Sequence, residues 1–358
     1  MPRRPLLIAA VLAAASALTA LPASGVVGGT RAKPTSYPWF VELPFCGGAL
    51  IAPDRVATAA HCVAGLPLRD VGAVRVGGNT VRQAIGISAE PGYVRRALAG
   101  TDNRDAPVGD VAIVLLGRPV PVVKPLTLRT RQNKAGQRAL LLGGGQKMVP
   151  KKVVRKAANF EKLRKVTLKV ISDGACRAYY RKHGGKTYGS AFRAATMLCA
   201  TDTDGRAPFG SACSGDSGGP LVVGTRLAGI VSWGLRCGGD KDPTVFTDPS
   251  AYRPFLLSAS PVLAPVSSGQ AAGLAGEARV GVTLTCTSPA WLRQPDRIEF
   301  SFQSYRFQHG TLTRQRGASP TYVVRSSDKG RLVSCAATGI NVGGFETSKE
   351  SEALRIPS

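Results

Sequence analysis

A serine in a glycine-rich loop is the first residue that could carry out nucleophilic chemistry. Ser217 lies within Cys213-Ser-Gly-Asp-Ser-Gly-Gly-Pro220. Glycines on both sides let the backbone bend tightly, and the amides of Gly215 and Ser217 could converge on one substrate oxygen. A serine hydroxyl attacks a carbonyl well only when a base removes its proton and a third group orients that base. The loop therefore predicts acyl transfer if a histidine and a carboxylate are supplied elsewhere.

The chain holds three histidines, so few residues could be the base. His61 follows the apolar run Val56-Ala-Thr-Ala-Ala60 and precedes Cys62, which predicts a buried strand and a disulfide that fix its backbone. His183 stands among positive residues and is expected on the surface, and His309 stands beside Gly310 in an expected turn. His61 is the preferred base.

The sequence Gly215-x-Ser217-x-Gly219 also satisfies the nucleophile elbow of α/β-hydrolases, which would make this chain an esterase or lipase. That elbow must lead into a helix. Here the serine leads into a glycine-proline turn and then an apolar strand, and the required later histidine could only be His309. The elbow interpretation is therefore disfavoured.

Taken together, Thr58-Ala-Ala-His-Cys62 and Cys213 to Pro220 resemble two motifs of the trypsin- and chymotrypsin-like serine proteases. The resemblance covers residues 26 to about 257. It implies an all-β fold of two six-stranded antiparallel β-barrels with the active site between them. It also implies a serine endopeptidase that hydrolyses peptide bonds through an acyl-enzyme intermediate.

The same resemblance implies roles for individual residues. Ser217 matches the nucleophile, His61 the general base, and the amides of Gly215 and Ser217 the oxyanion hole. The orienting carboxylate should precede a buried strand, so Asp110 in Gly109-Asp-Val-Ala-Ile113 is preferred to Asp102 or Asp105 in the polar loop before it. Ser232, Trp233 and Gly234 match the strand that binds the substrate backbone, and the Ser232 hydroxyl should also support Asp110.

The specificity pocket is expected to differ from that of a lysine- or arginine-cutting protease. In the family, the residue six before the nucleophile lies at the pocket base, and here it is Ser211. Gly234 leaves one wall open, whereas Thr244 aligns where glycine often stands on the other wall and should narrow the pocket. We expect small or medium uncharged residues before the cut bond, with bulky aromatic residues as the second choice.

The resemblance also gives meaning to Val26-Val-Gly-Gly29, which matches the amino terminus that forms on activation. Its free amine would pair with Asp216, next to the nucleophile. No lysine or arginine stands directly before Val26, so no trypsin-type activation site is visible. Cleavage after Gly25 would release Val26 directly, so we expect an enzyme that is active on secretion without a separate zymogen step.

Residues 1–25 read as an export signal. Arg3 and Arg4 give a positive start, Leu6 to Leu21 is almost wholly apolar, and Ala23-Ser-Gly25 offers small residues at a cleavage point. A retained membrane anchor is the alternative, but the run is slightly short to span a bilayer. We expect a secreted, extracellular protein without a membrane span after cleavage.

Eight cysteines behind such a signal favour disulfides over zinc ligation, since no Cys-x-x-Cys occurs and the histidines are far apart in the sequence. No metal or other cofactor is expected. The protease resemblance implies three pairs and leaves a fourth for the rest of the chain: Cys46–Cys62, Cys176–Cys199, Cys213–Cys237 and Cys286–Cys335.

Short apolar runs bounded by Gly, Pro or Asp predict strands up to residue 257, with one short closing helix within 249–257. We expect a linker at 258–275, which is rich in Ala, Ser, Pro and Gly. Residues 276–358 alternate like strands, and Cys286, Trp291 and Cys335 resemble the pattern of a small Ig-like β-sandwich. Such a module could be a passive spacer or a weak adhesion domain.

The chain is strongly basic, with a formal net charge of +25. The excess peaks between Lys147 and Lys186. It either keeps a solvated face soluble or attracts anionic polymers and acidic substrates. No nucleic-acid recognition motif is present, so no specific nucleic acid is expected, and protein or peptide substrates remain the expected partners. The rival to an active protease is an inactive protease-like protein that binds or adheres, although such proteins usually lose a residue of the triad.

Overall fold

The computed structural model describes residues 26–101, 105–145, 163–306 and 309–358. The predicted export signal at 1–25 lies outside these ranges. So do Asp102 and the stretch 147–162, which carries many of the basic residues. No helix within the described ranges is long and apolar enough to cross a membrane.

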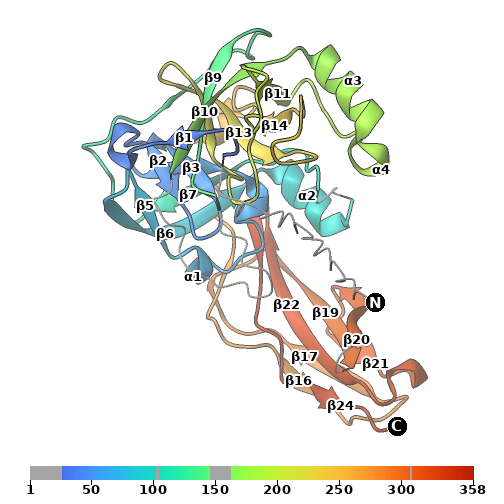
Figure 1. Ribbon diagram of the computed structural model, residues 1–358. Helices are drawn as coiled ribbons and strands as arrows, with labels where there is room; N and C mark the ends of the chain where they lie inside the picture. Colours follow the sequence, from blue (N-terminus) through green and yellow to red (C-terminus); the bar gives the residue numbers. More distant parts are fainter. Residues whose placement is uncertain (1–25, 102–104, 146–162, 307–308) are drawn as a thin grey trace, which may run out of the picture.

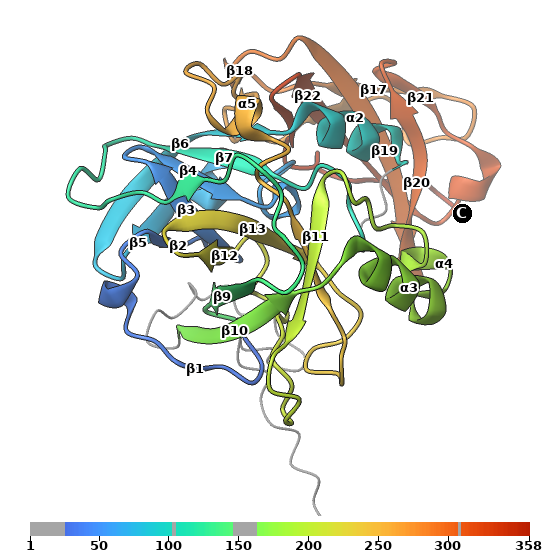
Figure 2. The ribbon, with the colours of Figure 1, turned by 90° about the horizontal axis from the view of Figure 1, so that it is seen from above.

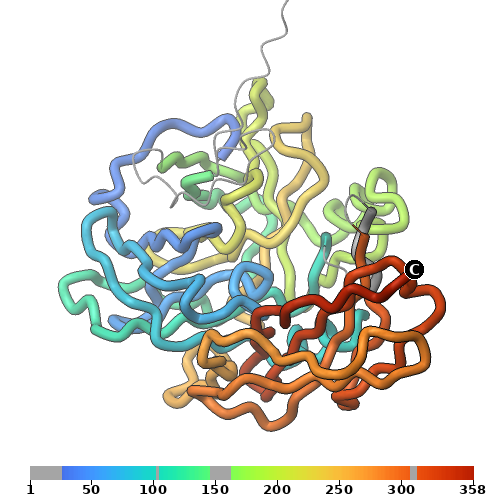
Figure 3. Tube along the Cα trace, turned by 90° about the horizontal axis from the view of Figure 1, so that it is seen from below, coloured from blue at the N-terminus to red at the C-terminus, as the bar shows by residue number. Residues whose placement is uncertain are grey.

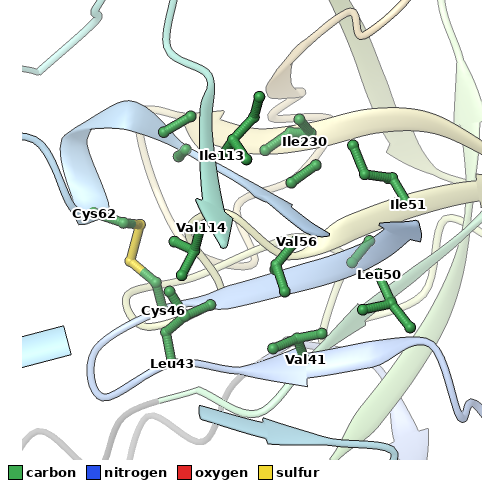
Figure 4. Close-up of a cluster of buried hydrophobic side chains, with 14 of the residues drawn as sticks. Val41, Leu43, Cys46, Leu50, Ile51, Val56, Cys62, Ile113, Val114 and Ile230 are labelled. Carbon is green, nitrogen blue, oxygen red and sulfur yellow. A yellow bond between two sulfur atoms is a disulfide. The ribbon is translucent and has the colours of Figure 1, made fainter. Parts of the chain in front are cut away.

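The first half of the protease-like region folds into a closed antiparallel barrel with the strand order β2-β3-β4-β7-β6-β5. Its interior is filled by alternate apolar side chains of the strands, which Figure 4 shows around Val56, Val114 and the Cys46–Cys62 disulfide. The strands are β2 (Phe40–Glu42), β3 (Gly47–Ala52), β4 (Arg55–Thr58), β5 (Ala73–Val76), β6 (Thr80–Ala89) and β7 (Ala112–Leu116).

A second antiparallel barrel follows. It closes because β9 pairs with both β10 and β12, so the ring runs β9-β10-β11-β14-β13-β12. Its strands are β9 (Arg138–Gly143), β10 (Arg164–Val170), β11 (Met197–Asp202), β12 (Pro220–Val223), β13 (Arg226–Trp233) and β14 (Thr244–Thr247), with β1 (Thr30–Arg31) on β10 and β8 (Thr127–Leu128) beside β13. The two barrels lie side by side (Figures 1 and 2), which confirms the predicted fold class.

Helices are few, and the closing one, α5, lies within the predicted span. The longer helices α2 and α3 were not expected from the sequence pattern. Helix α3 begins where the Ser172 hydroxyl accepts a hydrogen bond from the Ala175 amide, a capping signal that is visible in the sequence. The helical segments are η1 (Pro34–Ser36), η2 (Ala60–Cys62), α1 (Leu68–Val71), α2 (Pro91–Ala99), α3 (Asp173–His183), α4 (Gly185–Tyr188), α5 (Arg253–Leu256) and η4 (Ser326–Asp328).

Residues 258–358, here named the C-terminal unit, form an elongated set of strands beside the barrels (Figure 1). Sheet β16-β17-β21 packs on sheet β20-β19-β22-β23 through Leu284, Phe302, Tyr322 and Val333. The two sheets are compatible with a sandwich. The strands are β15 (Val266–Ser267), β16 (Gly273–Ala275), β17 (Thr283–Thr287), β18 (Trp291–Arg293), β19 (Arg297–Arg306), β20 (His309–Gly317), β21 (Thr321–Val323), β22 (Leu332–Asn341), β23 (Gly344–Thr347) and β24 (Leu354–Arg355).

The stretch 258–275 is not the bare linker that its composition suggests. It contains β15, which pairs with β18, and β16, which pairs with β17. Ala264, Ser267 and Ala272 are buried there. Small residues are needed at these positions because the chain runs between packed strands, and this need is not visible from composition alone.

All four expected disulfides are present, and no described cysteine is free. Cys46–Cys62 joins the start of β3 to the turn that carries His61. Cys286–Cys335 joins the two sheets of the C-terminal unit, on β17 and β22.

Candidate active site

A fully buried carboxylate lies where the two barrels meet. Asp110 precedes β7 of the first barrel and has no exposed surface. Its Oδ1 accepts a hydrogen bond from the His61 amide at 2.9 Å, and its Oδ2 lies 2.7 Å from His61 Nδ1. The Ser232 hydroxyl, on β13 of the second barrel, donates to Oδ2 at 2.6 Å. Asp110 therefore joins residues of both barrels.

The surroundings of Asp110 decide its ionisation. Burial alone would raise the pKa of this carboxyl, but the His61 ring and amide and the Ser232 hydroxyl together hold the pKa below its usual value. A carboxylate that keeps its charge in the interior favours the His61 tautomer that is protonated at Nδ1 and stabilises a protonated ring.

His61 lies in the short turn η2 at the end of β4, and its side chain is 29% exposed. Its turn is anchored by the disulfide from Cys62 to Cys46. The two sulfur atoms and a ring nitrogen lie within 4.8 Å of one another, but the sulfurs are bonded to each other and offer no thiolate to a metal ion.

The Ser217 loop packs directly against the strand that leads to His61. The Gly47 amide donates to the Ser217 carbonyl at 2.8 Å. Gly218 has a φ of +74°, and a Cβ placed on it would lie 2.3 Å from the Thr58 hydroxyl oxygen. Only glycine allows both this conformation and this close approach, so the loop packs directly beside the strand that leads to His61.

Among the described residues, no hydrogen bond is found for the Ser217 hydroxyl or for the amides of Gly215 and Ser217. Contacts between a nucleophile and its base are often long without substrate and tighten when substrate binds. One hydroxyl and two backbone donors in the same loop are thus available to a ligand.

Asp216, the neighbour of Ser217, is fully buried and meets the start of the described chain. Its Oδ2 accepts from the Val26 nitrogen at 2.6 Å and from the Cys213 amide at 2.9 Å. The Gly145 amide donates to Oδ1 at 3.1 Å. Burial raises the pKa of Asp216 to about 6, and these donors oppose the rise. The structure therefore brings the predicted pair of Val26 and Asp216 together.

A cavity of about 260 Å³ opens beside Ser217. Four of the five residues predicted to bind substrate line it, namely Ser232, Trp233, Gly234 and Thr244. The fifth, Ser211, does not. It is buried behind the lining, and its Oγ accepts from the Gly238 amide at 2.7 Å. The next residue, Ala212, lines the cavity instead, and its amide donates to the Thr244 hydroxyl oxygen at 3.2 Å.

Sequence reasoning missed a charged residue of this cavity. Arg236 lines it and forms two hydrogen bonds, of 2.6 and 2.9 Å, with the buried carboxylate of Asp242. The Tyr179 hydroxyl of α3 donates to the same carboxylate. The position of Arg236, three residues after Trp233, was the available signal, and the partner Asp242 could not be recognised without the fold.

None of the other residues considered as the base or the carboxylate is among the described residues that line this cavity. His183 is exposed in the last turn of α3, and its ring centroid lies 4.7 Å from that of Tyr179. The backbone of His309 begins β20 rather than a turn, which corrects the expectation from Gly310. Asp102 is outside the described residues, whereas Asp110 is the carboxylate that meets the His61 ring.

The arrangement has the groups that acyl transfer requires. An oriented imidazole can accept a proton, a neighbouring loop supplies a hydroxyl, and two amides can donate to an oxygen that becomes negative. The cavity beside the hydroxyl can hold one side chain of a substrate.

The chain is similar to known proteins over most of the two-barrel region. The family model for Trypsin matches residues 26–256. Trypsin theta of Drosophila melanogaster is 33% identical over 254 residues, covering 66% of this chain and 87% of that protein. Trypsin of Saccharopolyspora erythraea is 32% identical over 244 residues, covering 65% of this chain and 96% of that protein. The structure of neuropsin, a serine protease expressed in the limbic system of mouse brain, aligns with a TM-score of 0.49 and 28% identity over 63% of this chain and 95% of its own.

We predict that Ser232→Ala lowers the free energy of unfolding at pH 7 by about 1.5–3 kcal/mol, the usual contribution of a hydrogen bond to a charged group. The folded pKa of Asp110 is depressed, so its contribution is complete above the unfolded pKa of about 4 and is lost as the pH falls through the folded pKa. The difference between the two proteins should therefore shrink in acid. Urea unfolding between pH 2 and 7 measures this.

Ser88→Ala is the matched control for that experiment, because Ser88 is also a buried serine but makes no hydrogen bond to a described carboxylate. A loss in Ser232→Ala at pH 7 that is no larger than the loss in Ser88→Ala would contradict the assigned hydrogen bond to ionised Asp110.

Proposed function

The chain belongs to the trypsin family of serine proteases and is a serine-type endopeptidase, and from this premise we propose that it cuts peptide bonds with a triad of Ser217, His61 and Asp110. The observation that carries the proposal is the buried Asp110 carboxylate, which contacts His61 from one barrel and Ser232 from the other. Ser217 lines the adjoining cavity.

The reaction follows from the roles of these groups. As Ser217 Oγ attacks the substrate carbonyl, His61 takes its proton, and Asp110 stabilises the protonated ring. The amides of Gly215 and Ser217 donate to the carbonyl oxygen as it becomes negative. His61 then gives the proton to the leaving amine, which departs and leaves an acyl-enzyme. A water molecule, activated by the same base, attacks the ester and restores the Ser217 hydroxyl.

The proposed preference is for small or medium uncharged residues before the cut bond. Thr244 lines the cavity, and its hydroxyl oxygen accepts a hydrogen bond from the Ala212 amide. No described acidic side chain lines the cavity, and its one described charged residue, Arg236, is already paired with Asp242. A lysine or arginine of a substrate would thus find no free carboxylate there.

Activation is proposed to need only the removal of residues 1–25. The Val26 nitrogen already lies 2.6 Å from Asp216 Oδ2, and the Val26 side chain is buried in the core of the second barrel. In a chain that begins at Val26, this nitrogen is an ammonium group, and its charge lowers the pKa of Asp216. The ion pair then fixes the loop that carries Ser217.

We further propose that the protein is exported to an oxidising compartment, since it has four disulfides. The proposed division keeps a protease domain at 26–257 and an Ig-like sandwich at 276–358, with the strand-containing stretch 258–275 between them. Attraction to anionic polymers stays a prediction. Two basic residues of the stretch 147–186 are hydrogen-bonded within the fold: Arg164 to the Gly29 carbonyl and Lys165 to the Tyr37 hydroxyl.

We predict that Ser217→Ala lowers kcat on the order of 10⁶-fold, because the variant lacks the hydroxyl proposed as the nucleophile. A serine-reactive phosphonate should label the wild-type protein and fail to label this variant. Ser214→Ala is the matched control, since Ser214 is in the same loop and lines the same cavity. Labelling of the wild type that persists in Ser217→Ala would refute the nucleophile assignment.

Substrate preference gives a second test. Peptides that end in Ala or Leu before the cut bond should have the highest kcat/KM, and Lys the lowest. Thr244→Gly should raise kcat/KM for Phe relative to Ala about 10-fold or more, because it removes a branched side chain from the cavity. Thr244→Ser retains the hydroxyl and should change the ratio less. Lys as the best wild-type substrate would contradict the proposed pocket.

A third test concerns the amino terminus. A protein that begins at Gly25 replaces the Val26 ammonium by an amide, so the buried Asp216 loses its counter-charge, and kcat/KM should fall about 10²-fold or more. In this protein the folded pKa of about 6 lies above the unfolded pKa of about 4, so the stability contributed by protonated Asp216 is lost as the pH rises from 4 to 6. Equal activity of proteins that begin at Gly25 and at Val26 would exclude this activation mechanism.

A further inference from the structure

The C-terminal unit contacts the segment that follows His61 and Cys62. This segment, residues 63–71, is here named the post-histidine segment. Gly65 pairs with Glu346 of β23 in a parallel bridge. The Phe345 ring is so close that a Cβ on Gly65 would lie 2.5 Å from a ring carbon. Phe345 also packs against the core of the first barrel. The C-terminal unit is therefore packed onto the protease domain here.

Glu346 is the polar centre of this contact. It is only 1% exposed. Its Oε2 accepts a hydrogen bond from the Leu68 amide of the post-histidine segment at 3.3 Å. On the other side, its Oε1 accepts from the Ser267 amide at 3.0 Å and the Ser267 hydroxyl at 2.5 Å. This one buried carboxylate thus accepts hydrogen bonds from the post-histidine segment and from the C-terminal unit. Its removal would leave these donors without their acceptor.

The C-terminal unit also forms hydrogen bonds with β6. This strand pairs with β7, the strand that Asp110 precedes. The Ala89 amide of β6 donates to the Gly343 carbonyl at 2.8 Å, and the Ala264 amide donates to the Ile87 carbonyl of β6 at 2.7 Å. The Arg293 guanidinium donates to the Ile85 carbonyl at 3.1 Å. Along β6, Ala89 pairs with Ala112, two residues after Asp110. The C-terminal unit therefore contacts both the segment after His61 and the strand beside the one that follows Asp110.

Little space is left in this interface. The cavity between the two parts has a volume of about 10 Å³, at the lower limit of the room that one water molecule needs. It is lined by residues of both parts, among them Val63, Ile87, Ala264 and Phe345. In Figure 3 the orange and red trace of the C-terminal unit lies along the first barrel. Close packing with satisfied hydrogen bonds describes a fixed interface and not a flexible tether.

We infer that the C-terminal unit is a structural part of the active site, and that Glu346 is a positioning residue that fixes the post-histidine segment and thereby the His61 ring. The inference rests on the proposed function, because it requires His61 to be the general base. The segment is fixed at one end by Cys62–Cys46 and further along by Leu68 with Glu346. Without the Glu346 side chain, the post-histidine segment loses the hydrogen bond at Leu68, and the turn that carries His61 is held less firmly.

The kinetic consequence is specific. The cavity proposed to bind substrate is lined by residues of the second barrel and its loops, which Glu346 does not contact. Loss of the contact should therefore lower kcat and leave KM nearly unchanged. A misplacement of a catalytic group by about 1 Å can cost up to about 100-fold in rate.

The test uses the full chain processed at Val26, with Glu346→Ala and the control Glu350→Ala. Glu350→Ala removes the same charge from the same unit, but Glu350 is exposed, and its one hydrogen bond within the described residues is to Ser334 of that unit. We expect kcat of Glu346→Ala to fall about 10- to 100-fold with KM within threefold, and amide hydrogen exchange in residues 63–71 to accelerate. Glu350→Ala should match the wild type in all three measurements.

A second pair of variants tests the same contact from the protease side and decides the matter if Glu346→Ala does not fold. Gly65→Ala and Gly136→Ala place alanine at similar φ values, +82° and +87°, but only Gly65 has a neighbour within 4 Å. Both therefore have the same backbone strain, and only Gly65→Ala pushes on Phe345. We expect kcat of Gly65→Ala to be at least about 10-fold below that of Gly136→Ala.

The inference is wrong if Glu346→Ala keeps kcat within twofold of the wild type, if its loss is confined to KM, or if Glu350→Ala loses as much. When Glu346→Ala gives no folded protein, equal kcat in Gly65→Ala and Gly136→Ala overturns it. A wild-type protein that is folded but neither cuts peptides nor reacts with the phosphonate would instead refute the proposed function.

Discussion

The contact between His61 and Asp110 is the interaction on which the rest of the structure depends. A carboxylate with no exposed surface would be costly if it lacked partners, and it is stable here because His61 and Ser232 approach it from different barrels. The Thr247 hydroxyl, also in the second barrel, donates to the Asp110 carbonyl at 2.9 Å. The same group that would orient a general base thus also fixes the relative position of the two barrels. This one buried charge therefore needs partners from both barrels.

Much of this site could be predicted from the sequence because short motifs carry its chemistry. The loop around Ser217 and the turn around His61 are specific in themselves, and the strand after Asp110 distinguishes it from the acidic residues of the preceding loop. The four disulfides and the two barrels were predicted correctly for the same reason. Ser211 shows the limit of such reasoning: its position in the motif suggested the pocket base, but the fold turns its hydroxyl to the Gly238 amide and places it behind the lining.

Features that depend on distant partners could not be predicted. Glu346 and Leu68 are 278 positions apart, and nothing in the local pattern of either residue marks the contact. Composition suggested a linker at 258–275, whereas strand pairing with β17 and β18 gives this stretch its structure. The post-histidine segment has no long helix or strand of its own, so its conformation is set by the Cys46–Cys62 disulfide and by the C-terminal unit. The residues that the sequence suggested were an appended module are, in the fold, packed against the first barrel beside the post-histidine segment.

The most direct measurement of the central claim is the ¹⁵N NMR spectrum of the protein labelled at histidine nitrogens, recorded near neutral pH. We expect the His61 ring to carry its proton on Nδ1, with Nε2 unprotonated, and this proton to exchange slowly because Asp110 accepts it in the interior. Asp110→Asn should abolish that preference. A His61 ring that is protonated on Nε2 in the wild type, or one whose tautomer is unaffected by Asp110→Asn, would contradict the role given to this carboxylate.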